Sequence, residues 1–578
     1  MTNRERTIIR PAVSCQSVEQ LSDLPPLLRR IYALRGVSGP DELQYSPGAL
    51  IPPEQLGGTA GAAKLIHQVM ENNGRILIVA DFDADGATSC ALAVRSLTAM
   101  GAERVMFMVP NRFSDGYGLT EEIAGKAADF GPDLVITVDN GISSLKGVAL
   151  LREKGIAVMV TDHHLPGTDL PNANVIVNPN SPDESFESKH LAGVGVVLYV
   201  MVALRAWLRQ IGWFESRDLA EPNLADFLDL VALGTVADVV RLDHNNRILV
   251  QQGLARIRAG RCCPLIREIF SKAGKSLARA VAGDLGFIVG PRLNAAGRLD
   301  DMSVGIAALI SDSSIQAAKT ADLLDQMNSE RKQIEQAMKE QALEHLSRLE
   351  LGEQLPYGLC VYQEGWHQGV IGILASRIKD RYHRPVIAFA EADENTLKGS
   401  ARSIEGLHIR DTLEAIAVAC PRLLQKFGGH AMAAGLTLAK SDFGEFRSRF
   451  DEAVAVQLRG RSLTGELVSD GSLESDQLDL QLAEQLDQAG PWGQGFPEPL
   501  FDDWFEIEQQ RTVGGRHAKM TLRRKDCSEI LEAIAFNQAE SMPAQQGATI
   551  HAAYRLSVNE FRGARTLQLM IEYFQVVK

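Results

Sequence analysis

Short apolar segments of strand length alternate with longer amphipathic segments between about residue 75 and residue 180. The apolar segments are residues 76–80, 105–109, 134–138, 157–161 and 175–177, and helical patterns occupy residues 121–128 and 144–154. Strands that are buried on both faces read as continuous apolar runs, and strands that alternate with helices form parallel sheets. The pattern therefore predicts an α/β domain with a parallel sheet and helices on both of its faces.

Acidic residues directly follow three of these apolar segments. They are Asp81, Asp83 and Asp85 after the first, Asp139 after the third, and Asp162, which precedes the pair His163 and His164, after the fourth. The carboxyl ends of parallel strands meet at one edge of the sheet, where ligands bind. Carboxylates suit hard divalent cations such as Mg²⁺ and Mn²⁺. A solvated acidic turn would explain the first motif alone, but the repetition at three strand ends favours a metal centre.

A further candidate ligand, Asp238, stands in the otherwise apolar segment 228–240. An unpaired carboxylate there would be costly, so it needs either a metal or an arginine such as Arg241. Two cations held by this set would activate water and clamp a phosphodiester. Because neighbouring strand-end residues point in opposite directions, we expect His163 to be a ligand and His164 to face the substrate or an outer acid.

The rest of the chain divides by pattern into further units. We expect an N-terminal segment 1–50, a catalytic domain 51–311, a connecting helix 312–350, a second α/β domain 351–458 and a β-rich domain 459–578. The connecting segment contains neither Pro nor Gly and would span roughly 50 Å as one helix, with a break near Asn328 as the alternative. Small residues beside Ser, Arg, Lys and His in the second α/β domain predict phosphate binding.

The β-rich domain carries short strands at 554–558 and 567–571, separated by a turn at 559–563. Residues 511–525 hold six basic residues and no acid. A small β-barrel with a basic face would bind single strands through backbone charge and base stacking. The alternative is a barrel whose basic strand simply faces water.

Composition limits the class of protein. With 578 residues, 45% of them hydrophobic, we expect roughly two to four globular domains. The net charge of −14 counts mildly against a nucleic-acid partner, although acids in a metal site contribute to it. Seven cysteines without a CxxC motif indicate reduced thiols in a cytoplasmic protein. No signal peptide is seen, and the most apolar run, 194–204, is too short to span a bilayer, so no membrane is expected.

The sequence Asp162-His163-His164, taken with residues 81–86, resembles the DHH phosphoesterases. Further motifs are similar, in order, to those of the bacterial RecJ exonucleases within that family. They are residues 110–113, 138–144, 191–195, 234–238, 290–298, 366–369 and 427–430. The resemblance covers nearly the whole chain, and in that family the C-terminal region is an OB-fold. One departure is Ala401, where some relatives carry glycine.

The resemblance implies an exonuclease that degrades single-stranded DNA from the 5′ end to 5′-mononucleotides, in recombination and repair. It implies Mn²⁺ or Mg²⁺, with two ions expected, held by Asp83, Asp85, Asp139, His163 and Asp238, with Asp81 in the same motif. It assigns catalytic or substrate contacts to Asp139, His163, His164, Arg112, Arg292, Asn294, Arg298, Ser400, Arg402, Gly428, Gly429 and His430, leaving open whether Arg292 or Arg298 meets the scissile phosphate. It also implies single-stranded-DNA-binding protein and a helicase as partners, and a monomer.

Two other functions are weighed against this one. A small-molecule DHH phosphodiesterase that cleaves dinucleotides or cyclic dinucleotides would resemble the two α/β domains without the β-rich domain. An inert DNA-binding scaffold would have lost candidate ligands, whereas here every one is present.

Overall fold

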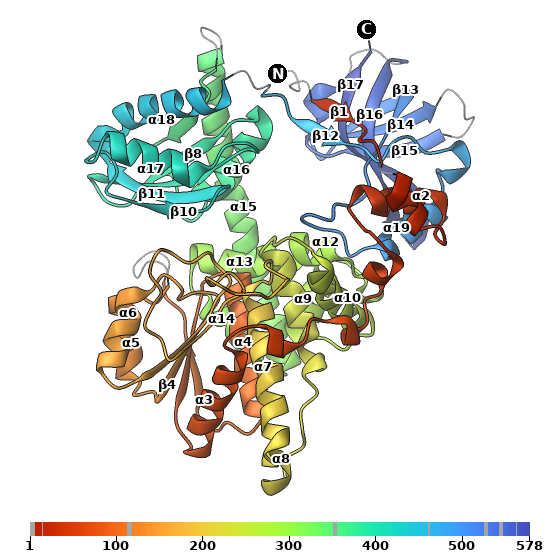
Figure 1. Cartoon of the computed structure of the whole chain (residues 1–578). Coiled ribbons are helices and arrows are strands. Elements are labelled where there is room, and N and C mark those ends of the chain that lie inside the picture. The colour runs from red at the N-terminus through yellow and green to blue at the C-terminus, as the bar shows by residue number, and fades with distance from the viewer. Residues whose placement is uncertain are drawn as a thin grey trace.

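The computed structural model describes residues 6–13, 15–111, 118–350, 355–459, 463–524, 530–542, 547–561 and 563–577. Three domains are arranged around one long helix, with the catalytic domain below and the second α/β domain and the barrel above it (Figure 1).

The catalytic domain is built on a five-stranded parallel sheet in the order β3-β2-β4-β5-β6. Its strands are β2 (Ile76–Ala80), β3 (Val105–Met108), β4 (Leu134–Val138), β5 (Ala157–Thr161) and β6 (Val175–Val177). Alternate residues of β2 face opposite ways: Leu77 and Val79 join one apolar cluster, while Ile76 and Ile78 join another.

Helices cover both faces of this sheet, as the sequence pattern predicts. The cluster on one face includes residues of α5 (Glu121–Asp129) and α6 (Leu145–Glu153). The opposite cluster includes residues of α3 (Thr59–Glu71), α4 (Ala84–Ala99), α7 (Gly193–Gln210) and α9 (Leu228–Ala237). Among the described residues, α7 is the one helix long and apolar enough to cross a membrane. Since 61% of that helix is buried inside the protein, it packs here as a core helix.

The connecting helix α15 (Ser314–Glu350) is continuous, so the alternative of a break near Asn328 is wrong. Its first half packs into the core of the catalytic domain through Leu324 and Met327. Its second half packs into the second α/β domain through Met338 and Ala342. One helix therefore carries both domains.

The second α/β domain has a mixed sheet in the order β10-β11-β9-β8-β7. The strands are β7 (Leu359–Tyr362), β8 (Val386–Glu391), β9 (Thr396–Arg402), β10 (Lys426–Gly429) and β11 (Ala433–Ala439). Helix α16 (Ile371–Tyr382) packs on β7 and β8, whereas α17 (Ile409–Ala419) and α18 (Phe443–Leu458) pack on the opposite face. On the α16 side, β9 presents Lys398, Ser400 and Arg402, each only partly buried.

The C-terminal domain is a closed five-stranded barrel in the order β13-β14-β15-β17-β16. Its strands are β13 (Phe501–Val513), β14 (His517–Arg524), β15 (Ile530–Ala535), β16 (Thr549–Phe561) and β17 (Ala564–Val576). Two strands are longer than the sequence suggests: β16 and β17 pair as far as Phe561 and Ala564, so the predicted turn at 559–563 is shorter.

The N-terminal segment packs against both the barrel and the core of the catalytic domain. Strand β1 (Thr7–Ile9) pairs in parallel with β12 (Glu466–Val468), which precedes the barrel. Helix α2 (Pro26–Leu34) inserts Ile31 into the barrel's apolar cluster, which also contains residues of α19 (Leu480–Ala489). Figure 1 shows α2 beside α19, far from its sequence neighbours in α3.

The basic stretch 511–525 does not form the continuous basic face expected from sequence. Lys519 pairs with Glu532 at 3.0 Å, and Arg523 pairs with Glu508. Arg524 is buried, with its Nη1 3.6 Å from Asp503 Oδ2. These acids lie on adjacent strands and offset the charge, while Arg511 and Arg516 remain exposed. Lys525 lies outside the described residues.

Candidate metal centre

The turn between β2 and α4 places three carboxylates at the edge of the parallel sheet. Asp83 caps α4 by accepting hydrogen bonds from the backbone N–H groups of Asp85 and Gly86, at 2.9 and 3.0 Å. The turn folds back so tightly that a Cβ on Gly86 would lie 2.5 Å from the Asp81 carbonyl oxygen. Glycine is therefore required in this turn, which carries Asp81, Asp83 and Asp85.

The N-terminus of α7 holds the third of these acids. Asp85 is buried, and its carboxylate accepts hydrogen bonds from the backbone N–H of Gly193 at 2.6 Å and of Val194 at 3.0 Å. A Cβ on Gly193 would lie 2.6 Å from the Cβ of Asp139, so only glycine permits this approach. Gly193-Val194-Gly195 is similar to a family motif, but its role in holding Asp85 was not predicted from the sequence, where a small residue at a helix start was the available signal.

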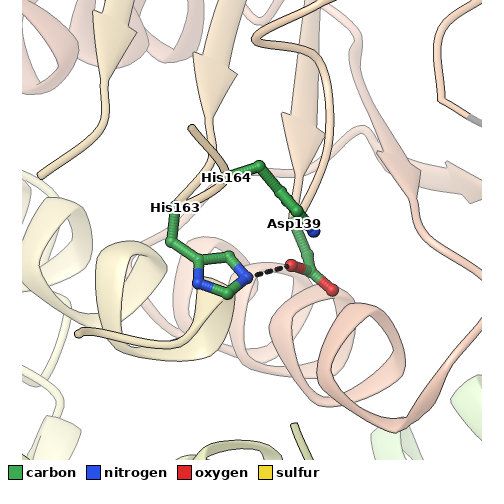
Figure 2. A group of neighbouring side chains, drawn as sticks. All are labelled: Asp139, His163 and His164. Atoms are coloured by element: carbon green, nitrogen blue, oxygen red, sulfur yellow. Dashed lines mark ion pairs between the residues drawn. The ribbon is translucent and has the colours of Figure 1, made fainter. Parts of the chain in front are cut away.

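Asp139 and His163 meet at the ends of β4 and β5. Asp139 has a φ of 62°, in the left-handed region that aspartate tolerates better than most residues. His163 Nε2 lies 3.1 Å from Asp139 Oδ1 and 3.5 Å from Asp238 Oδ2. Figure 2 shows the His163 ring directed at the Asp139 carboxylate. Asp238, at the end of α9, thus faces the cluster, whereas the Arg241 side chain packs beside Gly495.

Asp162 binds the backbone of both histidines and the ring of His164. Its carboxylate accepts hydrogen bonds from the backbone N–H of His163, His164 and Ile142, at 2.7, 3.1 and 2.9 Å. It also lies 2.7 Å from His164 Nδ1. Asp162 therefore fixes the orientation of the His164 ring.

Ligand atoms from these side chains form three overlapping groups that are each tight enough for one ion. The groups are Asp81, Asp83 and Asp139; Asp85, His163 and Asp238; and Asp139, His163 and His164, with the ligand atoms of each within 4.8 Å of one another. The metal set predicted from sequence is thus brought together, and His164 joins it in one group.

The electrostatics of the cluster favour the binding of a cation. Burial and the surrounding carboxylates raise the pKa of Asp139 and of Asp238 well above the ordinary value. Burial and the charge of Asp83 raise the pKa of Asp85 to about 7. Burial lowers the pKa of His163 to about 4, which keeps its imidazole neutral and able to donate a lone pair. Several acids and one neutral imidazole fit divalent ions such as Mn²⁺ or Mg²⁺.

His164 differs from His163 in its charge. Burial opposes its protonation, but the hydrogen bond to Asp162 and the charges of the nearby acids raise the pKa of His164 to about 9. A protonated imidazole at the edge of the cluster can donate a hydrogen bond to an anionic substrate.

The second α/β domain reaches this centre through His430. The His164 and His430 rings stack with centroids 5.9 Å apart and an interplanar angle of 20°. In the sheet behind His430, Ser400 pairs with Gly435, which pairs with Gly428. These positions form a row of small residues across three strands.

The row ends beside the start of α16. Arg402 Nη1 donates to Ser400 Oγ at 3.1 Å. A Cβ on Gly372, in the first turn of α16, would lie 2.9 Å from Arg402 Nη2. At the end of β10, Gly429 adopts a φ of 144°, and a Cβ there would lie 2.4 Å from the Ala433 carbonyl oxygen. A guanidinium, a hydroxyl and a helix N-terminus converge here, which suits a phosphate group.

Helix α13 (Gly290–Leu299) carries three residues that sequence analysis assigned to the substrate. Asn294 Oδ1 accepts the backbone N–H of Ala84 at 2.8 Å, so it braces the acidic turn. Arg292 pairs with Asp325 of α15, its Nη2 2.7 Å from the carboxylate. Arg298 Nη1 donates to the Gly369 carbonyl of the second α/β domain at 3.1 Å. Arg112 lies outside the described residues.

Comparison with known proteins identifies the family. The sequence profiles of the DHH family N-terminal domain, the DHHA1 domain and the RecJ OB domain match residues 75–235, 356–456 and 469–573. The single-stranded-DNA-specific exonuclease RecJ of Dickeya dadantii is 54% identical over 95% of this chain and 96% of its own length. That of Escherichia coli is 52% identical over 95% and 96%. The chain belongs to the RecJ family.

A solved RecJ structure supports the same architecture. The crystal structure of RecJ from Thermus thermophilus in complex with Mn²⁺ aligns with a TM-score of 0.81 and 28% identity, covering 100% of this chain and 80% of that one. The corresponding complex with Mg²⁺ aligns with a TM-score of 0.74 and 27% identity, covering 99% and 78%. The predicted fold class of a DHH domain, a connecting helix, an associated domain and an OB barrel is confirmed.

Proposed function

We propose that this RecJ-family protein is a metal-dependent exonuclease that hydrolyses single-stranded DNA from its 5′ end to 5′-mononucleotides. The observation that carries the proposal is the meeting of Asp139, His163 and Asp238 at one sheet edge, with His164 stacked on His430 of the second domain. Relatives that are 52–54% identical are named as single-stranded-DNA-specific exonucleases, which supports this substrate.

The residues proposed to hold the metal are Asp81, Asp83, Asp85, Asp139, His163 and Asp238. Thermus thermophilus RecJ binds Mn²⁺ and Mg²⁺, and two such ions are proposed here. Bound divalent ions supply hydroxide at neutral pH and charge stabilisation at the phosphodiester oxygens. The chain's contribution is to hold the ligand atoms of each group within 4.8 Å of one another and to keep His163 neutral.

The substrate is proposed to be held by charged groups on both sides of the centre. Protonated His164, oriented by Asp162, donates to an oxygen of the scissile phosphate. Arg298 is the arginine assigned to that phosphate, because its contact with the Gly369 carbonyl places it at the boundary between the metal centre and the second α/β domain. Asn294 acts on the acidic turn, and Arg112 is assigned to the strand by the family resemblance alone.

The 5′ polarity is proposed to come from the second α/β domain. Ser400, Arg402 and the first turn of α16 receive the terminal 5′ phosphate beside Gly428 and Gly429. His430, which follows Gly429, stacks on His164 and so connects this pocket with the metal centre. A strand whose end is fixed there presents its first phosphodiester to the metal centre.

The remaining assignments follow from this activity. We assign the N-terminal segment to 1–50, the catalytic domain to 51–311, the connecting helix to 312–350, the associated domain to 351–458 and the OB domain to 459–578. Single-stranded-DNA-binding protein and a helicase are proposed partners in recombination, mismatch repair and other DNA repair in the cytoplasm. A monomer is proposed because one chain supplies both the metal cluster and the phosphate pocket.

A small-molecule DHH phosphodiesterase is disfavoured by the C-terminal domain. A dinucleotide needs no OB barrel, yet residues 469–573 match the RecJ OB domain. OB barrels of this kind bind extended single strands.

The test uses the full-length protein and single-stranded oligonucleotides labelled at the 5′ or the 3′ end, with Mn²⁺. We expect the 5′ label to be released first as a mononucleotide, while the 3′ label stays on progressively shorter strands. EDTA should abolish degradation. Prior release of the 3′ label, or a preference for dinucleotides over long strands, would refute the proposal.

A further inference from the structure

We propose that α13, together with the 366–369 loop of the second α/β domain, sets the spacing between the metal centre and the 5′-phosphate pocket. This spacing fixes the length of the released product at one nucleotide. The inference rests on the proposed function and assigns positioning roles to Gly369 and Arg298.

One end of this connection is fixed to the acidic turn. Asn294 Oδ1 accepts the backbone N–H of Ala84 at 2.8 Å, between Asp83 and Asp85. A Cβ on Gly297 would lie only 1.9 Å from the Phe82 carbonyl oxygen, so α13 lies directly against the turn backbone. Asn294 and Gly297 are three residues apart and share a helix face. Any shift of α13 must therefore move the turn that carries the metal ligands.

The other end is fixed to the second domain, one helical turn further along. Arg298 Nη1 donates to the Gly369 carbonyl at 3.1 Å. A Cβ on Gly369 would lie 2.3 Å from the Arg298 carbonyl oxygen. Asn294 and Arg298 are separated by about 6 Å along the helix axis, at 1.5 Å per residue. The two domains thus touch here through the close approach of the Gly369 and Arg298 backbones and through the hydrogen bond of the Arg298 side chain.

The loop around Gly369 is in turn held rigidly inside its own domain. Trp366 Nε1 donates to Gln341 Oε1 of α15 at 2.8 Å, and Gln368 Nε2 donates to the Glu391 carbonyl at the end of β8 at 2.7 Å. Two residues after Gly369, α16 begins, and a Cβ on Gly372 would meet Ser400 Oγ at 3.0 Å. A displacement of Gly369 is therefore transmitted to the phosphate pocket.

This arrangement gives one rigid path from the metal ligands to the pocket. The path runs from the Asp83–Asp85 turn through α13 and Gly369 to the start of α16. If the pocket holds the terminal phosphate, the length of this path decides which phosphodiester reaches the metal centre. The Trp366-His367-Gln368-Gly369 motif then has a physical role as the joint between the domains.

The decisive variant is Gly369→Ala, because its added methyl group must push the loop away from the Arg298 carbonyl. A displacement on the order of 1 Å costs a positioned reaction about a hundredfold in rate. In single-turnover digestion of a 5′-labelled strand, we expect the wild type to release only mononucleotide. The variant should be about a hundredfold slower and should also release dinucleotide. Its Mn²⁺ affinity, measured by calorimetry on the full-length protein, should be unchanged.

The matched control is Gly444→Ala in α18 of the same domain, where an added Cβ meets nothing within 4 Å. It should match the wild type in rate and products. If Gly369→Ala does not fold, Gln341→Ala replaces it, since it removes the Trp366 acceptor from the exposed side of α15 and leaves the backbone intact. The same change of products is expected, to a smaller extent.

Three results would overturn the inference: mononucleotide as the sole product of the loop variant, whatever its rate; an unchanged rate; or a loss of Mn²⁺ affinity that accounts for the defect. A wild-type protein that leaves single strands intact would instead refute the proposed function, so the two failures are distinguishable.

Discussion

Replacing Asp139 with asparagine should have opposite effects on catalysis and on the stability of the ion-free protein. Asparagine has nearly the same shape and also tolerates the left-handed backbone at this position, where φ is 62°. The change therefore removes one negative charge and leaves the fold in place. Losing an anionic ligand from the cluster should reduce the rate at least about a thousandfold, which corresponds to about 4 kcal/mol of transition-state stabilisation.

The stability effect follows from the crowding of charges around Asp139. Asp85, Asp83, Asp238 and Asp81 all raise its pKa, in addition to burial. Two unit charges about 5 Å apart repel by about 3.3 kcal/mol at an effective dielectric constant of about 20. Partial protonation relieves some of this repulsion in the wild type, so we expect Asp139→Asn to stabilise the ion-free protein by about 1 kcal/mol, or roughly 2 °C in the Tm of the catalytic domain.

The dependence of stability on pH tests independently whether the crowded charges destabilise the ion-free protein. The ion-free folded state binds more protons than the unfolded state at Asp85, Asp139 and Asp238, because the pKa of each is raised. Stability in EDTA should therefore fall as pH rises from about 4 through the Asp85 pKa of about 7. His163 has the opposite effect. Because its pKa is lowered to about 4, it makes stability rise with pH until the pH reaches the ordinary pKa of histidine, but it is a single group opposing three acids. The slope should be shallower in the Asp139→Asn variant.

The assay is thermal unfolding of both proteins in EDTA and in Mn²⁺, from about pH 5 to about pH 8, beside exonuclease rates. Mn²⁺ at about a hundred times its Kd should stabilise the wild type by about 2.7 kcal/mol and the variant by less, so their order of stability should reverse on adding the metal. A variant that is less stable than the wild type in EDTA, or that keeps near-normal activity, would refute the placement of Asp139 in the metal site.

Three further changes test other parts of the site. Asp162→Asn removes the acceptor that raises the pKa of His164 to about 9, so activity should be lost at a lower pH than in the wild type, and an unchanged alkaline limb of the pH profile would contradict this role. Arg402→Ala should cost about 1.5–3 kcal/mol, or about 10- to 150-fold in kcat/KM, on 5′-phosphorylated strands and far less on 5′-hydroxyl strands, and equal losses would argue against the pocket. Charge reversal of the exposed pair Arg511 and Arg516 should reduce the slope of log affinity against log salt by about 2, and an unchanged slope would remove this hairpin from the DNA-binding surface.

The catalytic sheet could be predicted closely from sequence because its signals are local. Strands β4, β5 and β6 begin and end where the apolar runs do, and β3 is only one residue shorter. A parallel sheet aligns the carboxyl ends of its strands, so the acids after β2, β4 and β5 had to lie close together. The cluster at Asp139 and His163 follows from topology before any side-chain contact is known.

Contacts between distant segments could not be predicted in this way. Arg292 and Arg298 stand in one motif, yet Arg292 pairs with Asp325 and Arg298 contacts Gly369 of another domain. In the barrel, the basic run has acidic neighbours only across strands, as in the pair Lys519 and Glu532. Charge that is counted along the chain therefore overstates the charge on the surface.

The same limit explains why the support of the metal centre was missed while its ligands were found. Ligands are recognisable because carboxylates and imidazoles are few and carry chemistry, whereas their supports are backbone N–H groups that every residue has. Asp85 is held by the N–H groups of Gly193 and Val194, more than a hundred residues away. These hydrogen bonds lower the pKa of Asp85 against burial and the charge of Asp83, leaving it at about 7, while burial and the neighbouring carboxylates raise the pKa of Asp139 well above its ordinary value. Backbone hydrogen bonds thus stabilise the charge of Asp85, whereas the charge of Asp139 depends on a cation. The fold places the ligands, and the ion completes their neutralisation.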